Sequence, residues 1–135
     1  MEEKDYVTYE VAELLKSKGY NEPCNHYFRI YDKKFMESSG LLYNSDYINK
    51  EFDSNVVECT VPTLYEAHKW MREKYGMYVL VAPYHNSDYG KFLTFDIYRK
   101  IDCYPYLEYV NDSDDVFDSY EETLNVGIKK ALNFI

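Results

Sequence analysis

The segment His85-Asn86-Ser87-Asp88 places a serine, a histidine and an aspartate side by side in the chain. These are the side chains of a hydrolytic triad, in which histidine takes the serine proton and aspartate orients the histidine. A triad needs its members to converge from separate elements, and neighbours within one turn rarely point at one another. Because the same residues are strong turn formers, the pattern favours a polar turn over a catalytic site.

Cys24 and His26 are separated by one residue, and both side chains are zinc ligands. A structural zinc site usually takes four ligands in two close pairs, and the other cysteines and histidines supply no second pair. The sequence therefore favours buried cysteines and an exposed histidine. We expect no metal, no cofactor and no identifiable catalytic residue.

Eight of the 24 acidic residues lie between Ile101 and Ile128, a stretch that contains no Lys or Arg. The remaining 16 acids stand against 15 Lys and Arg, so this stretch accounts for most of the net charge of −9. It would repel phosphate, which makes direct nucleic-acid binding unfavourable. Within it we identify a candidate interaction surface composed of Asp112, Asp114, Asp115, Asp118, Glu121 and Glu122.

Two other interpretations of this acidic stretch stay open. Asp112 and Asp114 resemble the start of a calcium loop, but that loop needs an oxygen ligand at its fifth position and glycine at its sixth. Val116 and Phe117 occupy those positions. Acids in front of a helix also interact favourably with its N-terminal dipole, so the stretch is equally explained by helix capping and solubility.

Basic side chains are interleaved with aromatic ones over 69–75, a combination that can bind single-stranded nucleic acid. Glu66 and Glu73 lie on the same expected helix and dilute its positive charge. The pattern therefore favours a helix face exposed to solvent.

Three segments have the apolar spacing of amphipathic helices, namely 9–18, 64–75 and 120–133. Gly19 follows the first and is the residue type that ends helices in a left-handed conformation. Capping boxes open the other two, formed by Thr63 with Glu66 and by Ser119 with Glu122.

Two β-like runs, 77–84 and 92–99, are joined by turn-forming residues and predict an antiparallel hairpin. On the second run, Leu93, Phe95 and Ile97 alternate with Thr94, Asp96 and Tyr98, so these two sets face opposite sides. Shorter strands are expected at 26–31, 56–60 and 104–110. The region 32–55 is expected to be a long loop, or a loop around a short strand near 41–43.

The chain of 135 residues has the usual length of one domain. We therefore predict a single α+β domain spanning 1–135, with an antiparallel sheet built on the central hairpin and packed against about three helices. Three widely spaced cysteines indicate a reducing compartment. No signal peptide and no apolar run of about 20 residues is present, so we expect a cytoplasmic protein without a membrane span.

Several stretches also carry a resemblance to a known group. They are 9–16 with 22–24, 61–63 with 69–73, and 120–124 with 127–128 and 131–132. They resemble small proteins of gut Bacteroidetes that are often encoded near phage or mobile-element genes. The resemblance covers most of the chain outside 33–55. It implies a cytoplasmic accessory protein of phage type, and no site residues, because the group has no established activity.

Two classes of function remain open. The acidic stretch and the 17 tyrosines favour a non-enzymatic interaction protein that binds a protein partner or itself. A sharper version is an inhibitor whose acidic surface mimics nucleic acid and occupies a basic host protein. The alternative is a small enzyme of unrecognised type with a site near the hairpin.

Overall fold

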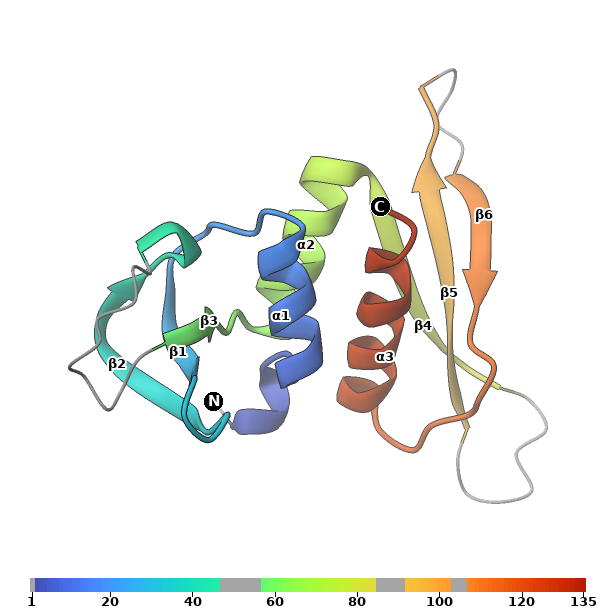
Figure 1. Cartoon of the computed structure of the whole chain (residues 1–135). Coiled ribbons are helices and arrows are strands. Elements are labelled where there is room, and N and C mark those ends of the chain that lie inside the picture. The colour runs from blue at the N-terminus through green and yellow to red at the C-terminus, as the bar shows by residue number, and fades with distance from the viewer. Residues whose placement is uncertain (1, 47–56, 85–91, 103–106) are drawn as a thin grey trace. The chain divides into compact units, whose positions relative to one another are not determined.

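The computed structural model describes residues 2–46, 57–84, 92–102 and 107–135 (Figure 1). The chain divides into two compact units, unit 1 from Met1 to Thr63 and unit 2 from Leu64 to Ile135. The single domain expected from the length of the chain stays a prediction.

The predicted α+β class is confirmed. The described residues form three α-helices and two three-stranded antiparallel sheets, and the expected hairpin and all three expected helices are present. The strands form two sheets where the sequence analysis expected one. The reason is that every strand finds its hydrogen-bonding neighbours within its own unit.

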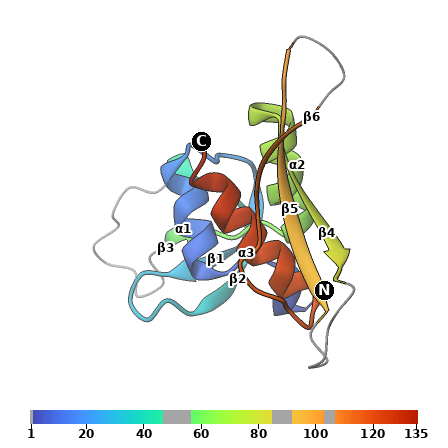
Figure 2. The same cartoon turned by 90° about the vertical axis from the view of Figure 1, so that its right-hand side faces the viewer.

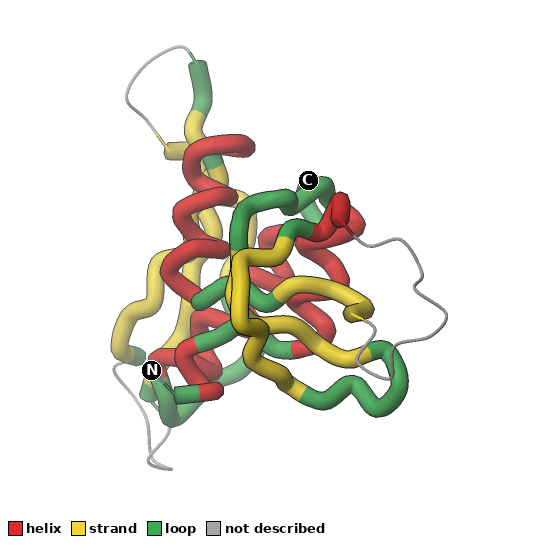
Figure 3. The backbone as a smooth tube through the Cα atoms, turned by 90° about the vertical axis from the view of Figure 1, so that its left-hand side faces the viewer, coloured by secondary structure: helices red, strands yellow, loops and turns green. Residues whose placement is uncertain are grey.

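The described residues of unit 1 form one α-helix and a sheet with the strand order β2-β1-β3 (Figure 3). Its elements are a 3-10 helix at Glu3–Asp5, α1 at Tyr9–Ser17, β1 at Cys24–Arg29, β2 at Phe35–Leu42, a 3-10 helix at Asn44–Asp46 and β3 at Val57–Thr60. As expected, Gly19 follows α1 with a left-handed φ of 93°.

Strand β2 is the main departure from the sequence-based expectation, which placed a loop or only a short strand in this region. Its pairing with β1 is irregular, because Cys24 lies opposite Leu42 whereas His26 lies opposite Glu37. The residues in between bulge out of the ladder. A bulge breaks the alternation of inward and outward side chains, and that alternation is the signal by which a strand is recognised in a sequence.

In unit 2, the residues that the structure describes form two helices and a sheet with the strand order β4-β5-β6. Its elements are α2 at Leu64–Tyr75, β4 at Met77–Pro83, β5 at Leu93–Lys100, β6 at Leu107–Asp112 and α3 at Tyr120–Leu132. The strand expected at 104–110 ends two residues later than expected, so Asp112 belongs to β6. Residues 103–106 lie outside the described part.

Helix α3 packs closely against the sheet of unit 2, on the same side as α2 (Figure 1). Met77, Val79, Phe95 and Ile97 point towards the helices and are buried. A Cβ atom at Gly127 of α3 would lie only 2.5 Å from Cγ1 of Val79, so this close approach requires glycine. No helix in the described ranges has the length and apolar character needed to cross a membrane.

Candidate functional site

One side of the sheet in unit 2 carries no helix of that unit, and Figure 2 faces this side. Successive residues of a strand point to opposite faces, so the neighbours of the buried residues Val79 and Phe95 point away from α3. We call this side the outer face and define it by Tyr78, Leu80, Asp96, Tyr98, Leu107, Tyr109 and Asp112. Asp96 and Tyr98 were predicted to lie opposite the buried side chains of β5, and this is confirmed.

Large apolar side chains of the outer face are open to solvent. Leu80 is 46% exposed, Leu107 42% and Tyr109 53%. Tyr84 and Phe92, which pair at the end of the hairpin, are 50% and 46% exposed. Single exposed apolar residues are ordinary on protein surfaces, but several on one sheet face mark an interaction site.

Two carboxylates lie directly opposite each other on the outer face. Asp96 of β5 pairs with Asp112 of β6, although like charges in such positions are destabilising. Within the described part of the chain, neither carboxylate forms an ion pair with Lys or Arg. The outer face therefore combines exposed apolar groups with a pair of carboxylates that form no ion pair among the described residues, and it also carries Lys100, which lies opposite Leu107.

Two tyrosines lie beside this acidic pair. The ring of Tyr98 meets that of Tyr109 edge to face, with 5.9 Å between the centroids. A hydrogen bond with Asp112, burial and the negative charges of Asp112 and Asp96 raise the pKa of Tyr109 to about 12. The phenol of Tyr109 consequently stays protonated at neutral pH and acts as a hydrogen-bond donor to Asp112.

The acidic residues singled out from the sequence are spread over three consecutive elements. Asp112 ends β6, Asp114, Asp115 and Asp118 lie in the connection to α3, and Glu121 and Glu122 lie in the first turn of α3. All of these residues except the half-buried Glu121 are exposed. The predicted helix cap is confirmed, because the side chain of Ser119 accepts a hydrogen bond of 3.1 Å from the backbone N–H of Glu122.

Lys130 of α3 offsets part of this acidic charge. Its Nζ lies 3.3 Å from a carboxylate oxygen of Asp114 and donates to the backbone carbonyl of Asp112 at 2.6 Å. The aromatic ring of Phe117 stacks on Phe95, and its backbone forms two hydrogen bonds with Leu93. The acidic connection is thus anchored to β5 and α3.

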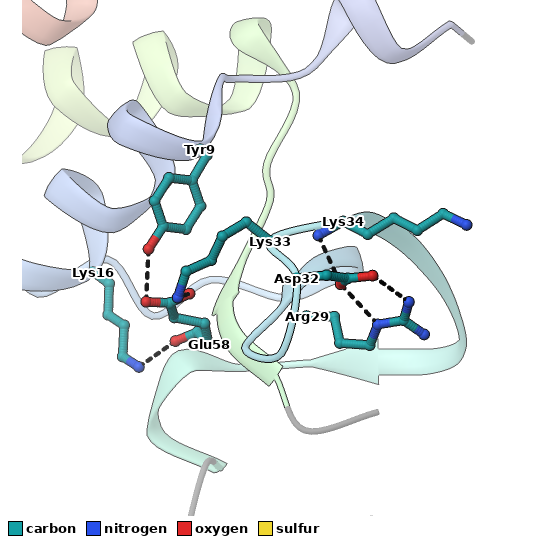
Figure 4. A network of polar contacts seen from close by, with 7 residues as sticks. All are labelled: Tyr9, Lys16, Arg29, Asp32, Lys33, Lys34 and Glu58. Carbon is teal, nitrogen blue, oxygen red and sulfur yellow. Dashed lines mark hydrogen bonds and ion pairs between the residues drawn. The ribbon is translucent and has the colours of Figure 1, made fainter. Parts of the chain in front are cut away.

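A polar network that the sequence analysis did not identify is centred on Glu58 of β3 (Figure 4). The hydroxyl of Tyr9 donates to its carboxylate at 2.6 Å, and Lys33 forms an ion pair with the same carboxylate. Lys16 donates to the backbone carbonyl of Glu58. The network ties β3 to α1 and to the turn between β1 and β2.

The protonation states of this network are fixed near neutral pH. Burial raises the pKa of Glu58, but the hydrogen bonds from Lys33 and Tyr9 outweigh it and hold that pKa below its ordinary value. The hydrogen bond to Glu58, with burial, raises the pKa of Tyr9 to about 12. An ionised carboxylate and a protonated phenol do not exchange a proton at neutral pH, so the network favours a structural role over acid–base catalysis.

The candidate metal ligands of unit 1 are engaged in packing. His26 stacks on Phe35 with 4.9 Å between ring centroids, and the buried Cys24 thiol donates to the carbonyl of Glu22 at 3.6 Å. In unit 2, Nε2 of His68 accepts a hydrogen bond from the backbone N–H of Val79 at 3.0 Å. No three His, Cys, Asp or Glu residues of the described ranges are grouped to hold a metal ion.

The remaining candidates from the sequence are the aromatic ring of Trp70, considered for nucleic-acid binding, and the segment 85–88, considered for catalysis. Trp70 is only 7% exposed, and Nζ of Lys74 lies 5.3 Å from its ring centroid, so this ring belongs to the core and is not free to stack on a base. The serine, histidine and aspartate of 85–88 lie outside the described residues.

Comparison of this chain with protein families, with characterised proteins and with solved structures returned no match. The resemblance to small proteins of gut Bacteroidetes stays a prediction from the sequence.

Proposed function

We propose that this protein is a non-enzymatic, cytoplasmic interaction protein of phage or mobile-element type, and that its outer face binds a protein partner through that partner's basic side chains. The observation that carries the proposal is the composition of the outer face. Exposed leucine and tyrosine side chains surround the Asp96–Asp112 pair on a sheet surface that no helix of unit 2 covers.

Apolar contact supplies the affinity in this proposal. Tyrosine is enriched at protein interfaces because its ring buries a large apolar area while its hydroxyl still forms a hydrogen bond. Leu80 of β4 and Leu107 and Tyr109 of β6 offer such contacts. The free, buried thiols of Cys24 and Cys59 are typical of a reducing compartment and support the cytoplasmic assignment.

Charge selects the kind of partner. Asp96 and Asp112 repel each other, and a Lys or Arg placed between them would relieve this repulsion. The rings of Tyr98 and Tyr109 beside the pair also attract cations. The net charge of −9 makes association with a basic surface faster and an acidic partner unfavourable.

The experiment captures partners from the lysate of a gut Bacteroidetes host, identifies them by mass spectrometry and measures each affinity with purified proteins. We expect a basic partner whose affinity falls at least tenfold in the D96N/D112N variant and in moderate salt. The matched control is Tyr31→Ser, because Tyr31 is an 87% exposed tyrosine of unit 1. If every partner binds the D96N/D112N and L80S/Y109S variants as well as the original chain, the proposal is wrong.

A second version of the same function is inhibition by mimicry of nucleic acid. The exposed side chains of Asp112, Asp114, Asp115, Asp118 and Glu122 support it. In this version, the D114N/D115N/D118N variant loses the partner, whereas L80S/Y109S retains it. DNA would also compete for the partner. The two versions are therefore separated by which set of variants weakens binding.

A further inference from the structure

The two edges of the sheet in unit 2 differ in how their backbone groups are satisfied. Backbone hydrogen bonds at the Gly76–Lys100 and Tyr84–Phe92 pairs mark the even-numbered residues of β4 as those that bond to β5. The N–H of Val79 therefore points to the open edge of β4. The side chain of His68 accepts its hydrogen bond at 3.0 Å, so α2 closes this position.

The outer edge of β3 in unit 1 is closed in a similar way. The backbone N–H of Thr60 donates to the side chain of Asn44 at 3.0 Å, and the carbonyl of Glu58 accepts from Lys16. Exposed strand edges pair readily with other chains, and proteins commonly block them with such side chains.

Strand β6 differs from these two edges. The same alternation places the backbone groups of Arg99 towards β6, where Glu108 lies opposite. The N–H and C=O groups of Leu107 and Tyr109 then point away from the sheet. Among the described residues, no side chain and no loop backbone group forms a hydrogen bond to these groups. The open edge ends at Asp112, whose carbonyl accepts from Lys130.

We propose that the basic partner docks as an extended segment along β6 and adds a fourth strand to the sheet of unit 2. This inference rests on the proposed function and specifies how the partner binds. Backbone hydrogen bonds to Leu107 and Tyr109 give affinity, and the side chains at alternate positions of the partner give specificity.

The charge of β6 identifies the occupant. Glu108 and Asp112 are exposed on the strand, and 101–128 contains no Lys or Arg. Opposite charges stabilise cross-strand pairs and like charges destabilise them, so the added strand carries Lys or Arg. A second copy of β6 would bring the same acids together, which disfavours pairing between two copies of this chain.

A display library of random short peptides, selected against the full chain, tests this inference. We expect enrichment of peptides with Lys or Arg at alternate positions. In spectra of the 15N-labelled protein, the amides of Leu107 and Tyr109 should shift most and exchange more slowly. N-methylation of alternate peptide bonds should weaken binding at least tenfold, because it removes the backbone donors of the added strand.

Protein variants provide the second measurement. Tyr109→Pro removes an outward N–H and should weaken peptide binding at least tenfold. Tyr109→Phe keeps the N–H and the ring and should lose far less. Circular dichroism and the fluorescence of Trp70, the single tryptophan, check that the variants fold.

The remaining outcomes separate the two proposals. Peptides that shift Leu80 and Tyr98, tolerate N-methylation and bind the Tyr109→Pro and Tyr109→Ser variants equally would overturn strand addition and leave the outer face as the binding site. A dimer of the chain that is lost in Tyr109→Pro would overturn the basic occupant. If no basic peptide is selected, or if neither the edge nor the outer-face variants affect binding, both proposals fail.

Discussion

Glu58 shows how single side chains hold unit 1 together. It is 49 positions from Tyr9 and 25 from Lys33 in the chain, yet its carboxylate contacts both side chains. Because the pKa of Tyr9 is raised, its hydrogen bond to Glu58 stabilises the folded protein fully below about pH 10, and this contribution is lost as the pH rises towards 12. The lowered pKa of Glu58 makes its effect complete above about pH 4.5 and lost as the pH falls further.

Replacement of Glu58 by Gln should release Tyr9 from this arrangement. We expect the pKa of Tyr9 to fall from about 12 towards its ordinary 10.0, because the charged acceptor of its hydrogen bond is gone. Titration of the Tyr9 ring carbons by NMR measures this change. Tyr109 serves as the internal control, because its raised pKa of about 12 comes from Asp112 and should be unaffected by the change at Glu58. An unchanged Tyr9 titration would contradict the prediction.

Lys33 combines an ion pair with an unfavourable backbone conformation. Its φ of 57° lies in the left-handed region, which costs a residue other than glycine about 1–2 kcal/mol. Lys33→Gly and Lys33→Ala both remove the ion pair with Glu58, but only the glycine variant relieves the backbone strain. We therefore expect the glycine variant to be the more stable of the two by about 1 kcal/mol. Urea unfolding tests this ranking, and equal stability would show that the strain is absent.

At the level of elements, Gly127 sets the distance between α3 and the sheet. A methyl group there would lie 2.5 Å from Val79 and 3.1 Å from Phe95. We expect Gly127→Ala to lower the free energy of unfolding by about 1–3 kcal/mol, as overpacking of a core does. Gly40→Ala is the matched control, because nothing lies within 4 Å of the added atom. The prediction fails if urea unfolding, followed by Trp70 fluorescence, gives equal losses for both variants.

His68 links α2 to the edge of β4 and should make unit 2 sensitive to acid. Burial, together with the charge of Arg72, lowers the pKa of His68 to about 4 from 6.5. The neutral ring therefore stabilises the fold fully above about pH 6.5, and this contribution is lost as the pH falls towards 4. His68→Gln keeps an acceptor for Val79 without titrating. Its stability should fall less than that of the original chain between pH 7 and 4, and parallel curves would contradict this.

The elements that could be predicted from the sequence are those defined by local patterns. The bounds of α2 are as expected because its apolar stripe and the glycine after it are neighbours in the chain. The two faces of β5 are as expected because alternation is also local. The bulge of β2, the contacts of Glu58 and the pairing of Asp96 with Asp112 depend on register between distant segments, and no local pattern encodes that register.

At the scale of the whole molecule, net charge opposes contact between the exposed apolar groups of different molecules. The chain carries a net charge of −9 at pH 7, while Leu41 is 65% exposed and the outer face exposes Leu80 and Leu107. Proteins with a net charge far from zero stay dispersed, and those near zero associate. The same charge that would steer a basic partner to the outer face should therefore oppose self-association at neutral pH.

This balance should reverse near the isoelectric point of about 4.8. We expect light scattering to rise as the pH approaches that value and to fall again on return to pH 7, because loss of net charge lets the outer faces of different molecules associate. Circular dichroism at the same pH separates association from unfolding. The L80S/L107S variant has the same charge as the original chain and should scatter less. If that variant associates equally, the molecules contact each other through another surface, and the prediction that they associate through the outer face is wrong.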